Sequence, residues 1–301
     1  MKAVVFAYHN VGVRCLKALI GGGVEVTLVV THRDNPKENI WFASVEQVAR
    51  DYGIPVITPD DPNTPEVLAQ VQAARPDFLF SFYYRHMLQA PLLECPAHGA
   101  FNMHGSLLPK YRGRVPINWA IIHGETETGA SLHVMNVKPD NGPVVDQMAV
   151  PILPDDNADE VFAKVTVAAE MVLARCLPAL LAGKAEFRQQ DLSLGGYFGG
   201  RKPEDGRIDP RAGAAQVHNF VRALTHPFPG AFADTESGRL VIWKTLRAGG
   251  HGQTLTRARL CAADGALWLD AADGGRLKVL SATLDGAPLE TLAQPLELAL
   301  D

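Results

Sequence analysis

The chain has 301 residues, of which 47% are hydrophobic and 20% charged, a composition typical of a globular protein with two domains or one large one. The formal net charge of −5 argues against tight non-specific binding to nucleic acid, which needs a basic face, and leaves a local basic patch open. The four cysteines are scattered without a C-x-x-C pair, which argues against a disulfide framework or zinc motif and indicates free thiols in a reducing compartment.

The first part of the chain alternates predicted strands with predicted helices. We expect strands at 2–8, 24–31, 54–57, 77–83 and around residue 101, and helices at 12–20, 44–52 and 64–74, the last with Thr64 as N-cap and Pro65 at its first position. The first apolar run is too short for a signal peptide or a membrane span, so a cytoplasmic location is expected. Strands that are apolar on both faces predict a mostly parallel sheet covered by helices, a Rossmann-like α/β fold. The turn at 8–12 lacks G-x-G-x-x-G, so NAD is not implied.

The remainder divides at a glycine-rich stretch. Strands are predicted at 129–135 and 144–152, followed by a helix at 157–182 whose cap is 155–157 and whose apolar stripe indicates core packing: Val161, Val165, Ala168, Val172, Cys176 and Leu180. A helix at 217–224 and short strands at 240–246, 257–262, 266–269 and 276–282 predict a small OB-like β-barrel. We therefore predict a catalytic α/β domain at 1–195, a connection at 196–205 and a β domain at 206–301.

The stretch from Phe101 to Arg114 carries the strongest chemical signal. Asn102 and His104 are two residues apart and point the same way in an extended strand. The Asn102 amide donates without titrating, and His104 changes its charge near neutral pH, so the pair suits oxyanion stabilisation and proton transfer. A lone histidine is more often structural, and the residues alone leave acyl transfer and proton transfer both open.

The run Phe101-Asn-Met-His-Gly-Ser-Leu-Leu-Pro-Lys-Tyr-Arg-Gly-Arg114 resembles the signature of the 10-formyltetrahydrofolate-dependent formyltransferase family. The resemblance covers nearly the whole chain and implies formyl transfer from 10-formyltetrahydrofolate to an amine, without a metal. It assigns Asn102, His104 and Asp140 to catalysis, with Asp140 as the partner that orients His104 and favours its charged form. Taken alone, Asp140 in Pro-Asp-Asn-Gly is a turn residue.

The resemblance also implies contacts with the folate donor. They fall in the loop after the fourth predicted strand, at one arginine and in the segment before the catalytic aspartate: His86, Met87, Leu88, Arg114, Asn136, Val137, Lys138 and Pro139. An arginine can pair with a folate carboxylate or carbonyl group. Without the resemblance, the aromatic stretch at 80–84 is strand core and Arg114 a solvated surface charge.

Within the family, the chain resembles most closely the branch that formylates the 4-amino group of UDP-4-amino-4-deoxy-L-arabinose, in lipid A modification and polymyxin resistance. The segments that carry this resemblance are 7–9, 31–36, 82–86, 107–113, 116–119, 123–129, 197–201 and 229–232. Asn10 and Asn141 depart from it, because an acidic and a small residue are usual there. The dehydrogenase domain of that branch is not expected in these residues, so only the transfer step is predicted. Arg201 is the candidate diphosphate contact, and an interdomain salt bridge is an equal alternative for it.

The main alternative is methionyl-tRNA formyltransferase, whose members carry a basic loop after the second strand. Here that loop, 31–40, contains Arg33, Asp34, Lys37 and Glu38, whose charges cancel, so a nucleotide sugar is favoured over nucleic acid as partner. Two further alternatives come from other functional classes: a formyltetrahydrofolate hydrolase and a non-catalytic folate-binding module. The three catalytic residues argue against the module, and the regulatory domain usual in hydrolases is not expected here.

Overall fold

The computed structural model describes residues 1–36, 38–250 and 253–299. Contacts between Cα atoms divide the chain into two compact units. The first unit comprises Met1–Pro116, Glu127–Val150 and Ala163–Gly199, and the second comprises Ile117–Thr126, Pro151–Phe162 and Gly200–Asp301. The predicted domain boundaries at 195 and 206 stay predictions.

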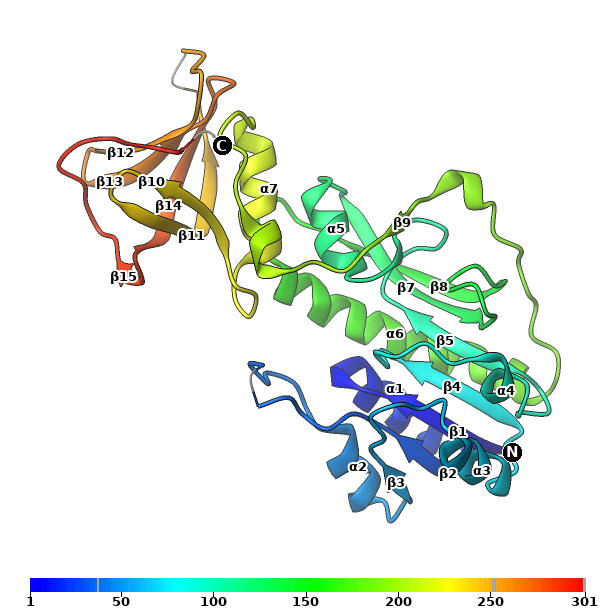
Figure 1. Ribbon diagram of the computed structural model, residues 1–301. Helices are drawn as coiled ribbons and strands as arrows, with labels where there is room; N and C mark the ends of the chain where they lie inside the picture. The colour runs from blue at the N-terminus through cyan, green and yellow to red at the C-terminus, as the bar shows by residue number, and fades with distance from the viewer. Residues whose placement is uncertain (37, 251–252, 300–301) are drawn as a thin grey trace. The chain divides into compact units, whose positions relative to one another are not determined.

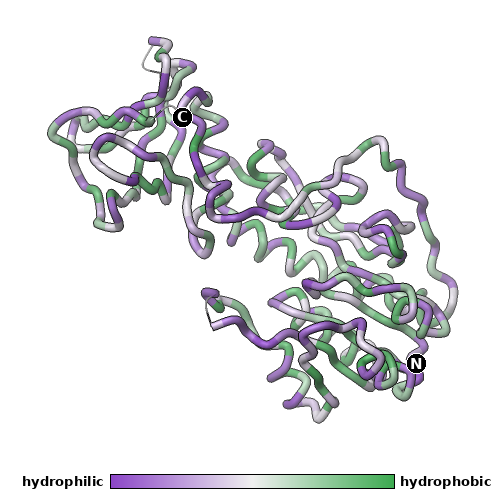
Figure 2. The backbone as a smooth tube through the Cα atoms, viewed as in Figure 1, coloured by the Kyte–Doolittle hydropathy of each residue, from purple (hydrophilic) through white to green (hydrophobic). Residues whose placement is uncertain are grey.

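A seven-stranded sheet forms the centre of the first unit, in the order β3-β2-β1-β4-β5-β7-β8 (Figure 1). Its strands are β1 (Lys2–Ala7), β2 (Glu25–Val30), β3 (Val56–Ile57), β4 (Phe78–Phe82), β5 (Ala100–His104), β7 (Glu127–Val134) and β8 (Val144–Pro151). The first five strands pair in parallel, whereas β7 pairs antiparallel with β5. The predicted α/β fold with a mostly parallel sheet is therefore confirmed. Its central strands are hydrophobic along their length, as Figure 2 shows.

Helices cover both faces of this sheet (Figure 1). The helices are α1 (His9–Gly21), α2 (Val45–Asp51), α3 (Pro65–Ala73), α4 (Ala90–Leu93) and α6 (Ala158–Leu181), of which residues from 163 belong to this unit. Val67 and Val71 of α3 and Leu92 of α4 pack with Phe6 and Leu79 of the sheet. The opposite face is covered by α1, α2 and α6. This two-sided burial explains why the strands lack polar alternation.

The long helix α6 begins and packs as its sequence predicts. At its start, Asn157 Oδ1 accepts from the Glu160 N–H at 2.9 Å, and Glu160 Oε2 accepts from the Asn157 N–H at 2.8 Å. This reciprocal pair is a capping box, which satisfies two backbone donors of the first turn. All six residues of the predicted apolar stripe are buried. The predicted cap and core stripe are thus confirmed.

In the first unit, two very short strands were not predicted. Strand β6 (Arg112–Gly113) pairs in parallel with β9 (Tyr197–Phe198), which lies inside the predicted connection. A short 3₁₀ helix, Pro203–Gly206, begins in that connection and ends one residue beyond it. Gly113 has a φ of 100°, and a Cβ there would lie 2.2 Å from the Phe198 carbonyl oxygen. Only glycine allows this approach, but two residues cannot display the alternation that identifies a strand.

The second unit contains a curved antiparallel sheet, close to a barrel, in the order β10-β11-β14-β13-β12-β16, with β15 beside β14. Its elements include α5 (Pro116–Ile122), α7 (Ala214–Leu224), β10 (Ala231–Thr235), β11 (Gly238–Ala248), β12 (Arg259–Ala263), β13 (Ala266–Asp270), β14 (Arg276–Leu284), β15 (Ala287–Pro288) and β16 (Leu296–Glu297). The predicted small β domain is confirmed, although β10, β15 and β16 were missed. No helix in the described part of the chain is long and apolar enough to cross a membrane.

The start of α3 offers a test of this local structure. The Thr64 hydroxyl accepts from the Val67 N–H at 3.4 Å, so Thr64→Ala leaves one first-turn donor without its partner. The free energy of unfolding should fall by about 1 kcal/mol, measured by urea denaturation. Thr64→Ser keeps the hydroxyl and should retain most of that stability. Equal losses in the two variants would contradict the capping role.

Candidate active site

The pairing of β5 with β7 assembles the first part of the site. In the register of these antiparallel strands, Asn102 lies opposite His133, and His104 lies opposite Ser131. Side chains two residues apart share one face of a sheet, so all four lie on the same side. His104 and His133 are buried, with 6% and 2% of their surface exposed, and Asn102 is half-buried. The site is thus formed on a buried, paired part of the sheet.

Asn102 is oriented by His133. The Asn102 Nδ2 and His133 Nε2 atoms are 3.1 Å apart, and His133 Nδ1 lies 2.9 Å from the Val134 carbonyl oxygen. That carbonyl can only accept, so Nδ1 carries a proton, and Nε2 faces one hydrogen of the Asn102 amide. The second amide hydrogen of Asn102 then remains available to a ligand.

His104 is held by the loop that follows β5. Its Nε2 atom lies 2.8 Å from the Tyr111 carbonyl oxygen, which can only accept, so Nε2 carries a proton. Its Nδ1 atom lies 3.6 Å from Asp140 Oδ1, too far for an ordinary hydrogen bond but close enough for a strong charge interaction. Nδ1 is therefore the nitrogen at which His104 can take up or release a proton.

Asp140 lies between the two imidazoles. Its Oδ1 is 3.4 Å from His133 Nε2, and its Oδ2 accepts from the Gly113 N–H at 2.8 Å. Burial alone would raise the pKa of Asp140, but the charge of His104, the contact with His133 and the Gly113 N–H outweigh burial and hold that pKa well below its ordinary value. The carboxylate therefore keeps its charge across the physiological range.

The turn that carries Asp140 is held in an unusual conformation. Asp140 has a φ of 54°, in the left-handed region that side chains other than glycine, asparagine and aspartate rarely adopt. The side chain of Asn141 accepts from Arg112 Nη1 at 2.8 Å, so the residue that departs from the family pattern has a defined partner. A Cβ at Gly142 would lie 1.8 Å from the Val134 carbonyl oxygen, so the turn packs directly onto β7.

His133 is the site residue that the sequence analysis missed. Its strand was predicted, but Asn102 and His133 meet only because β7 runs antiparallel to β5. The available signal was a polar pair, Ser131 and His133, alternating with apolar residues in a buried strand. That pattern indicates a polar face, but not what it faces.

The predicted folate residues after β4 differ in their exposure to solvent. His86 and Met87 are exposed, whereas Leu88 is buried with 3% of its surface exposed and belongs to the core. The main chain here is fixed by Asn63, whose Nδ2 donates to the Met87 carbonyl at 3.0 Å and whose Oδ1 accepts from the Gln89 N–H at 2.8 Å. The loop thus offers an ordered backbone edge beside two exposed side chains.

The other predicted folate residues lie near the catalytic candidates. Arg114 is exposed, and its main-chain N–H donates to the Phe198 carbonyl at 2.9 Å, so it follows directly on β6. The segment before Asp140 is largely exposed, with 68% of the Val137 surface open to solvent: Asn136, Val137, Lys138 and Pro139. These residues are accessible to a ligand.

Arg201 belongs to the second unit, and its surroundings there are aromatic. Its guanidinium carbon lies 4.8 Å from the centre of the Trp119 ring and 5.3 Å from that of Phe220. One of its terminal nitrogens donates to the Asp205 carbonyl, and burial lowers the pKa of the guanidinium. Its Nε atom is buried without a hydrogen-bond partner among the described residues. An anionic group could satisfy that donor.

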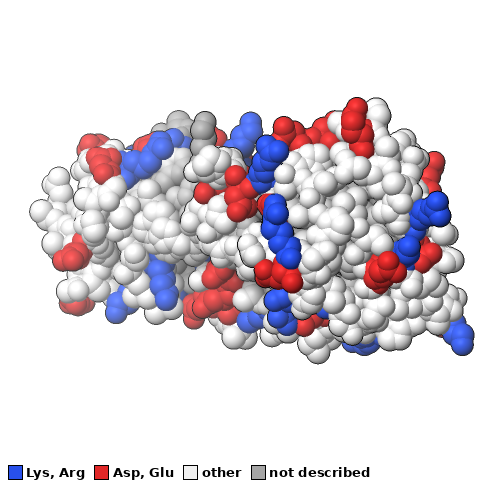
Figure 3. Space-filling model, turned by 90° about the horizontal axis from the view of Figure 1, so that it is seen from below, with Lys and Arg blue, Asp and Glu red and all other residues white. Residues whose placement is uncertain are grey.

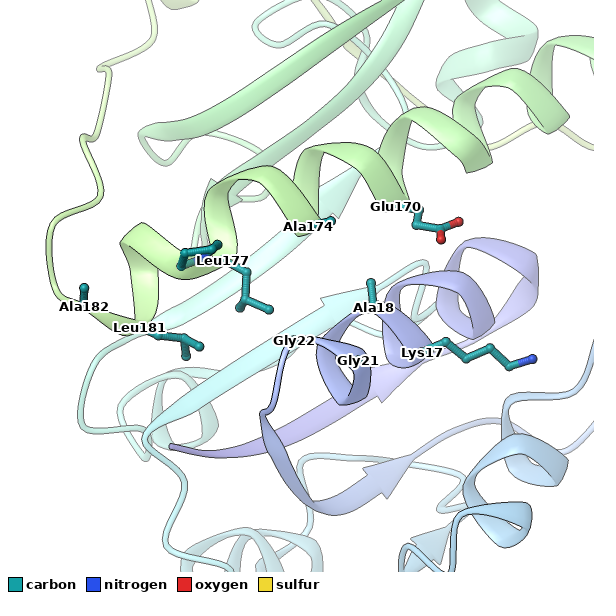
Figure 4. A pocket seen from close by; sticks show the side chains of 10 residues that line it. Lys17, Ala18, Gly21, Gly22, Glu170, Ala174, Leu177, Leu181 and Ala182 are labelled. Atoms are coloured by element: carbon teal, nitrogen blue, oxygen red, sulfur yellow. The ribbon is translucent and has the colours of Figure 1, made fainter.

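A separate cavity of about 770 Å³ lies between α1 and α6 (Figure 4). Its lining is mostly small and apolar, with Lys17 and Glu170 as its charged members, and Glu170 is paired with Arg14 at 2.7 Å. None of the predicted site residues lines it. Within residues 1–36, 38–250 and 253–299, no cluster of three or more His, Cys, Asp or Glu side chains is arranged to hold a metal ion.

Comparison with known proteins gives a consistent result. A family model described as "Formyl transferase" matches residues 1–177, and one described as "Formyl transferase, C-terminal domain" matches residues 201–290. WlaRD, a sugar 3N-formyl transferase solved with dTDP and 5-N-formyl-THF, has 18% identity and a TM-score of 0.72 over 97% of this chain and 99% of its own.

Two further structures show the same fold. The N-formyltransferase of Helicobacter canadensis, solved with folinic acid and dTDP-3-aminofucose, has 19% identity and a TM-score of 0.68 over 93% of this chain and 98% of its own. HypX from Aquifex aeolicus, solved with tetrahydrofolic acid, has 16% identity and a TM-score of 0.64, over 94% of this chain but 44% of its own. At these identities the likeness describes the fold alone.

The lowered pKa of Asp140 predicts how pH affects stability. A carboxylate with a depressed folded-state pKa stabilises the fold above its unfolded pKa of about 3.9, and this contribution is lost as the pH falls through the folded-state pKa. Asp140→Asn tolerates the left-handed backbone but removes the charge. It should lower the free energy of unfolding by roughly 1.5–3 kcal/mol at pH 7.

The measurement is urea denaturation of wild type and Asp140→Asn from neutral to acidic pH. The difference between them should stay constant down to about pH 5 and shrink below about pH 4. Asp60→Asn, at an exposed aspartate, is the control and should stay within about 0.5 kcal/mol of wild type. A pH-independent difference for Asp140→Asn would contradict the lowered pKa.

Proposed function

The chain belongs to the formyl transferase family, and we propose that it transfers a formyl group from 10-formyltetrahydrofolate to the 4-amino group of a nucleotide-linked amino sugar. As acceptor we propose UDP-4-amino-4-deoxy-L-arabinose, which would place the enzyme in lipid A modification and polymyxin resistance. The observation that carries the reaction is the convergence of Asn102, His104 and Asp140 within one unit, with His133 beside them.

The proposed chemistry follows from what each side chain can donate. The donor supplies a formyl carbon on a folate nitrogen, and attack by an amine creates an oxyanion on that carbon and an acidic proton on the amine. Collapse of this intermediate breaks the bond between the formyl carbon and the folate nitrogen, and the proton taken from the amine passes to that nitrogen, which releases tetrahydrofolate. The free amide hydrogen of Asn102 can stabilise the oxyanion without titrating. His104 Nδ1, when protonated, can do the same, and when neutral it can accept the amine proton.

Asp140 supports both roles of His104. Its carboxylate lies 3.6 Å from Nδ1, beside the atom that takes up the amine proton. Tyr111 holds the opposite nitrogen, so the ring cannot turn away from the carboxylate without losing a buried hydrogen bond. The arrangement thus couples orientation of the imidazole to stabilisation of its charge.

For the folate donor we propose the residues named from the family resemblance. The ordered backbone at His86–Leu88 suits the polar edge of a pterin, because its position is fixed by Asn63 before a ligand arrives. Arg114 is an exposed cation one residue beyond Gly113, whose N–H binds Asp140, and it suits a carboxylate or carbonyl of the same ligand. The exposed segment Asn136–Pro139 completes the proposed contacts.

A sugar acceptor is supported over tRNA by the charges of the chain. In the loop after β2, Asp34 accepts from the Tyr8 hydroxyl, Glu38 pairs with Arg85 at 2.9 Å, and Arg33 donates to Thr58; Lys37 lies outside the described residues. On the face shown in Figure 3, cationic and anionic side chains of the described residues are interspersed and form no basic surface. Backbone recognition of tRNA needs clustered lysine and arginine.

Arg201 is the proposed contact with the sugar-nucleotide diphosphate. Its support is the buried Nε, which lacks a hydrogen-bond partner among the described residues, and the position of the guanidinium against the Trp119 and Phe220 rings. A cytoplasmic location, where folate and nucleotide sugars are at hand, is part of the same proposal.

The catalytic assignment predicts graded losses. His104→Ala removes an oxyanion donor and the proton-transfer group, so kcat should fall by about 10²–10⁴-fold. Asn102→Ala removes a donor only and should cost about 10²–10³-fold. Asp140→Asn should lower kcat and change its pH profile. Steady-state kinetics with folate titration as the check of folding would test this, and a wild-type rate and profile for Asp140→Asn would remove Asp140 from the mechanism.

The acceptor is tested by a single panel assay. The protein is incubated with 10-formyltetrahydrofolate and UDP- or dTDP-linked amino sugars, initiator methionyl-tRNA or no acceptor, and tetrahydrofolate release is followed. A UDP-linked 4-amino sugar should be formylated at least about 100-fold faster than tRNA, because the charges of the loop after β2 are paired and do not form a cation cluster for the tRNA backbone. Efficient use of tRNA, formate release without acceptor, or folate binding without turnover would favour the three alternatives respectively.

A further inference from the structure

Gln190 contacts the main chain on both sides of the catalytic turn. Its Nε2 group donates to the Asp140 carbonyl at 3.0 Å and to the Gly142 carbonyl at 2.6 Å. Two carbonyls around one nitrogen fix the orientation of this amide, because its oxygen could not donate to either. The Gln190 Oε1 atom is buried and has no hydrogen-bond partner among the described residues. Gln190 is therefore held in place through its donor side.

The segment that carries Gln190 is itself anchored. Two residues upstream, Arg188 and Val144 exchange both backbone hydrogen bonds, each of 2.8 Å, so the segment lies along the start of β8. Two residues downstream, the Leu192 carbonyl accepts from Arg112 Nη2 at 3.3 Å. Figure 1 shows this segment running from the end of α6 past β8 toward β9. The main chain that carries Gln190 is thus held by hydrogen bonds on both sides of this residue.

The turn needs such a support. Asp140 has its φ of 54°, and the Gly142 backbone packs against the Val134 carbonyl so closely that no Cβ fits. A non-glycine residue in the left-handed region persists only where its surroundings hold it. The Asp140 carboxylate is tied by the Gly113 N–H, and Asn141 by Arg112. Gln190 is the residue that holds the turn's own carbonyls.

We propose that Gln190 is a positioning residue for formyl transfer, which sets the Asp140 carboxylate against His104 by holding the main chain of the turn. This inference rests on the proposed function, because it assigns a purpose to the Asp140–His104 contact. Loss of the two hydrogen bonds frees the turn to relax, and the 3.6 Å separation between carboxylate and imidazole is no longer maintained. A misplacement of about 1 Å at a reacting group can cost about 10²-fold in rate.

The test uses Gln190→Met, which keeps the length of the side chain and removes its donors. We expect kcat to fall by roughly 10–100-fold, with the KM for the folate donor changed by less than about twofold, because the loss concerns the reacting groups and not ground-state binding. Gln189→Met makes the same chemical change at the exposed neighbouring residue and is the matched control. It should keep the wild-type kcat.

A merely structural role for Gln190 is distinguished by the double variant. If Gln190 acts through Asp140, adding Gln190→Met to Asp140→Asn should cause almost no further loss of kcat per folded molecule, with the folded fraction measured by circular dichroism. Gln190→Glu adds a second readout. Its ionised carboxyl cannot donate, whereas the protonated form donates once, so its kcat relative to wild type should rise as the pH is lowered toward about 5.

Fully additive losses in the double variant, or a wild-type kcat for Gln190→Met, would overturn this inference and leave the proposed function intact. A wild-type kcat for Asp140→Asn would instead overturn the proposed role of Asp140, and the inference with it. Strong non-additivity together with the pH-dependent recovery of Gln190→Glu would support both.

Discussion

The site depends on one buried negative charge. Asp140 keeps its carboxylate ionised among two imidazoles and a backbone N–H, and it does so from a backbone conformation that has to be held in place. Burying a charge is costly unless it is paired and hydrogen-bonded, so the surrounding chain is organised to supply partners. Three features hold the main chain around this charge. They are the close approach at Gly113, the pairing of β6 with β9 and the turn around Gly142.

Much of this fold could be predicted because its signals are local. The apolar strands, the Thr64 cap and the stripe along α6 follow from propensity and periodicity within a few residues, and each is found as expected. The shared orientation of Asn102 and His104 could also be predicted, because two residues at a spacing of two lie on the same face of a strand. Asp140 was singled out by family resemblance alone, because in isolation it resembles any other turn aspartate.

The remaining parts of the site could not be predicted because they depend on pairing between distant segments. His133 reaches Asn102 only because β7 pairs antiparallel with β5, and the sequence did not predict the direction of that strand. Strand β6 likewise pairs with β9 across more than eighty residues. Gln190 follows the long helix in a stretch without periodicity, and nothing in its neighbours indicates that it reaches two carbonyls of another loop. The sequence shows which side chains can donate or accept protons, whereas the contacts between these distant segments depend on the topology of the fold.

The antiparallel pairing of β5 and β7 also restricts how this enzyme can change. Side chains alternate between the two faces of a sheet, so a shift of β7 by one residue would turn Ser131 and His133 away from Asn102 and His104. A shift of β7 by two residues would return these side chains to the same face of the sheet, but different residues would then lie opposite Asn102 and His104. Segments exchanged between this chain and a relative should therefore be joined in the loops outside Glu127–Val134, and the length of that strand should be left unaltered.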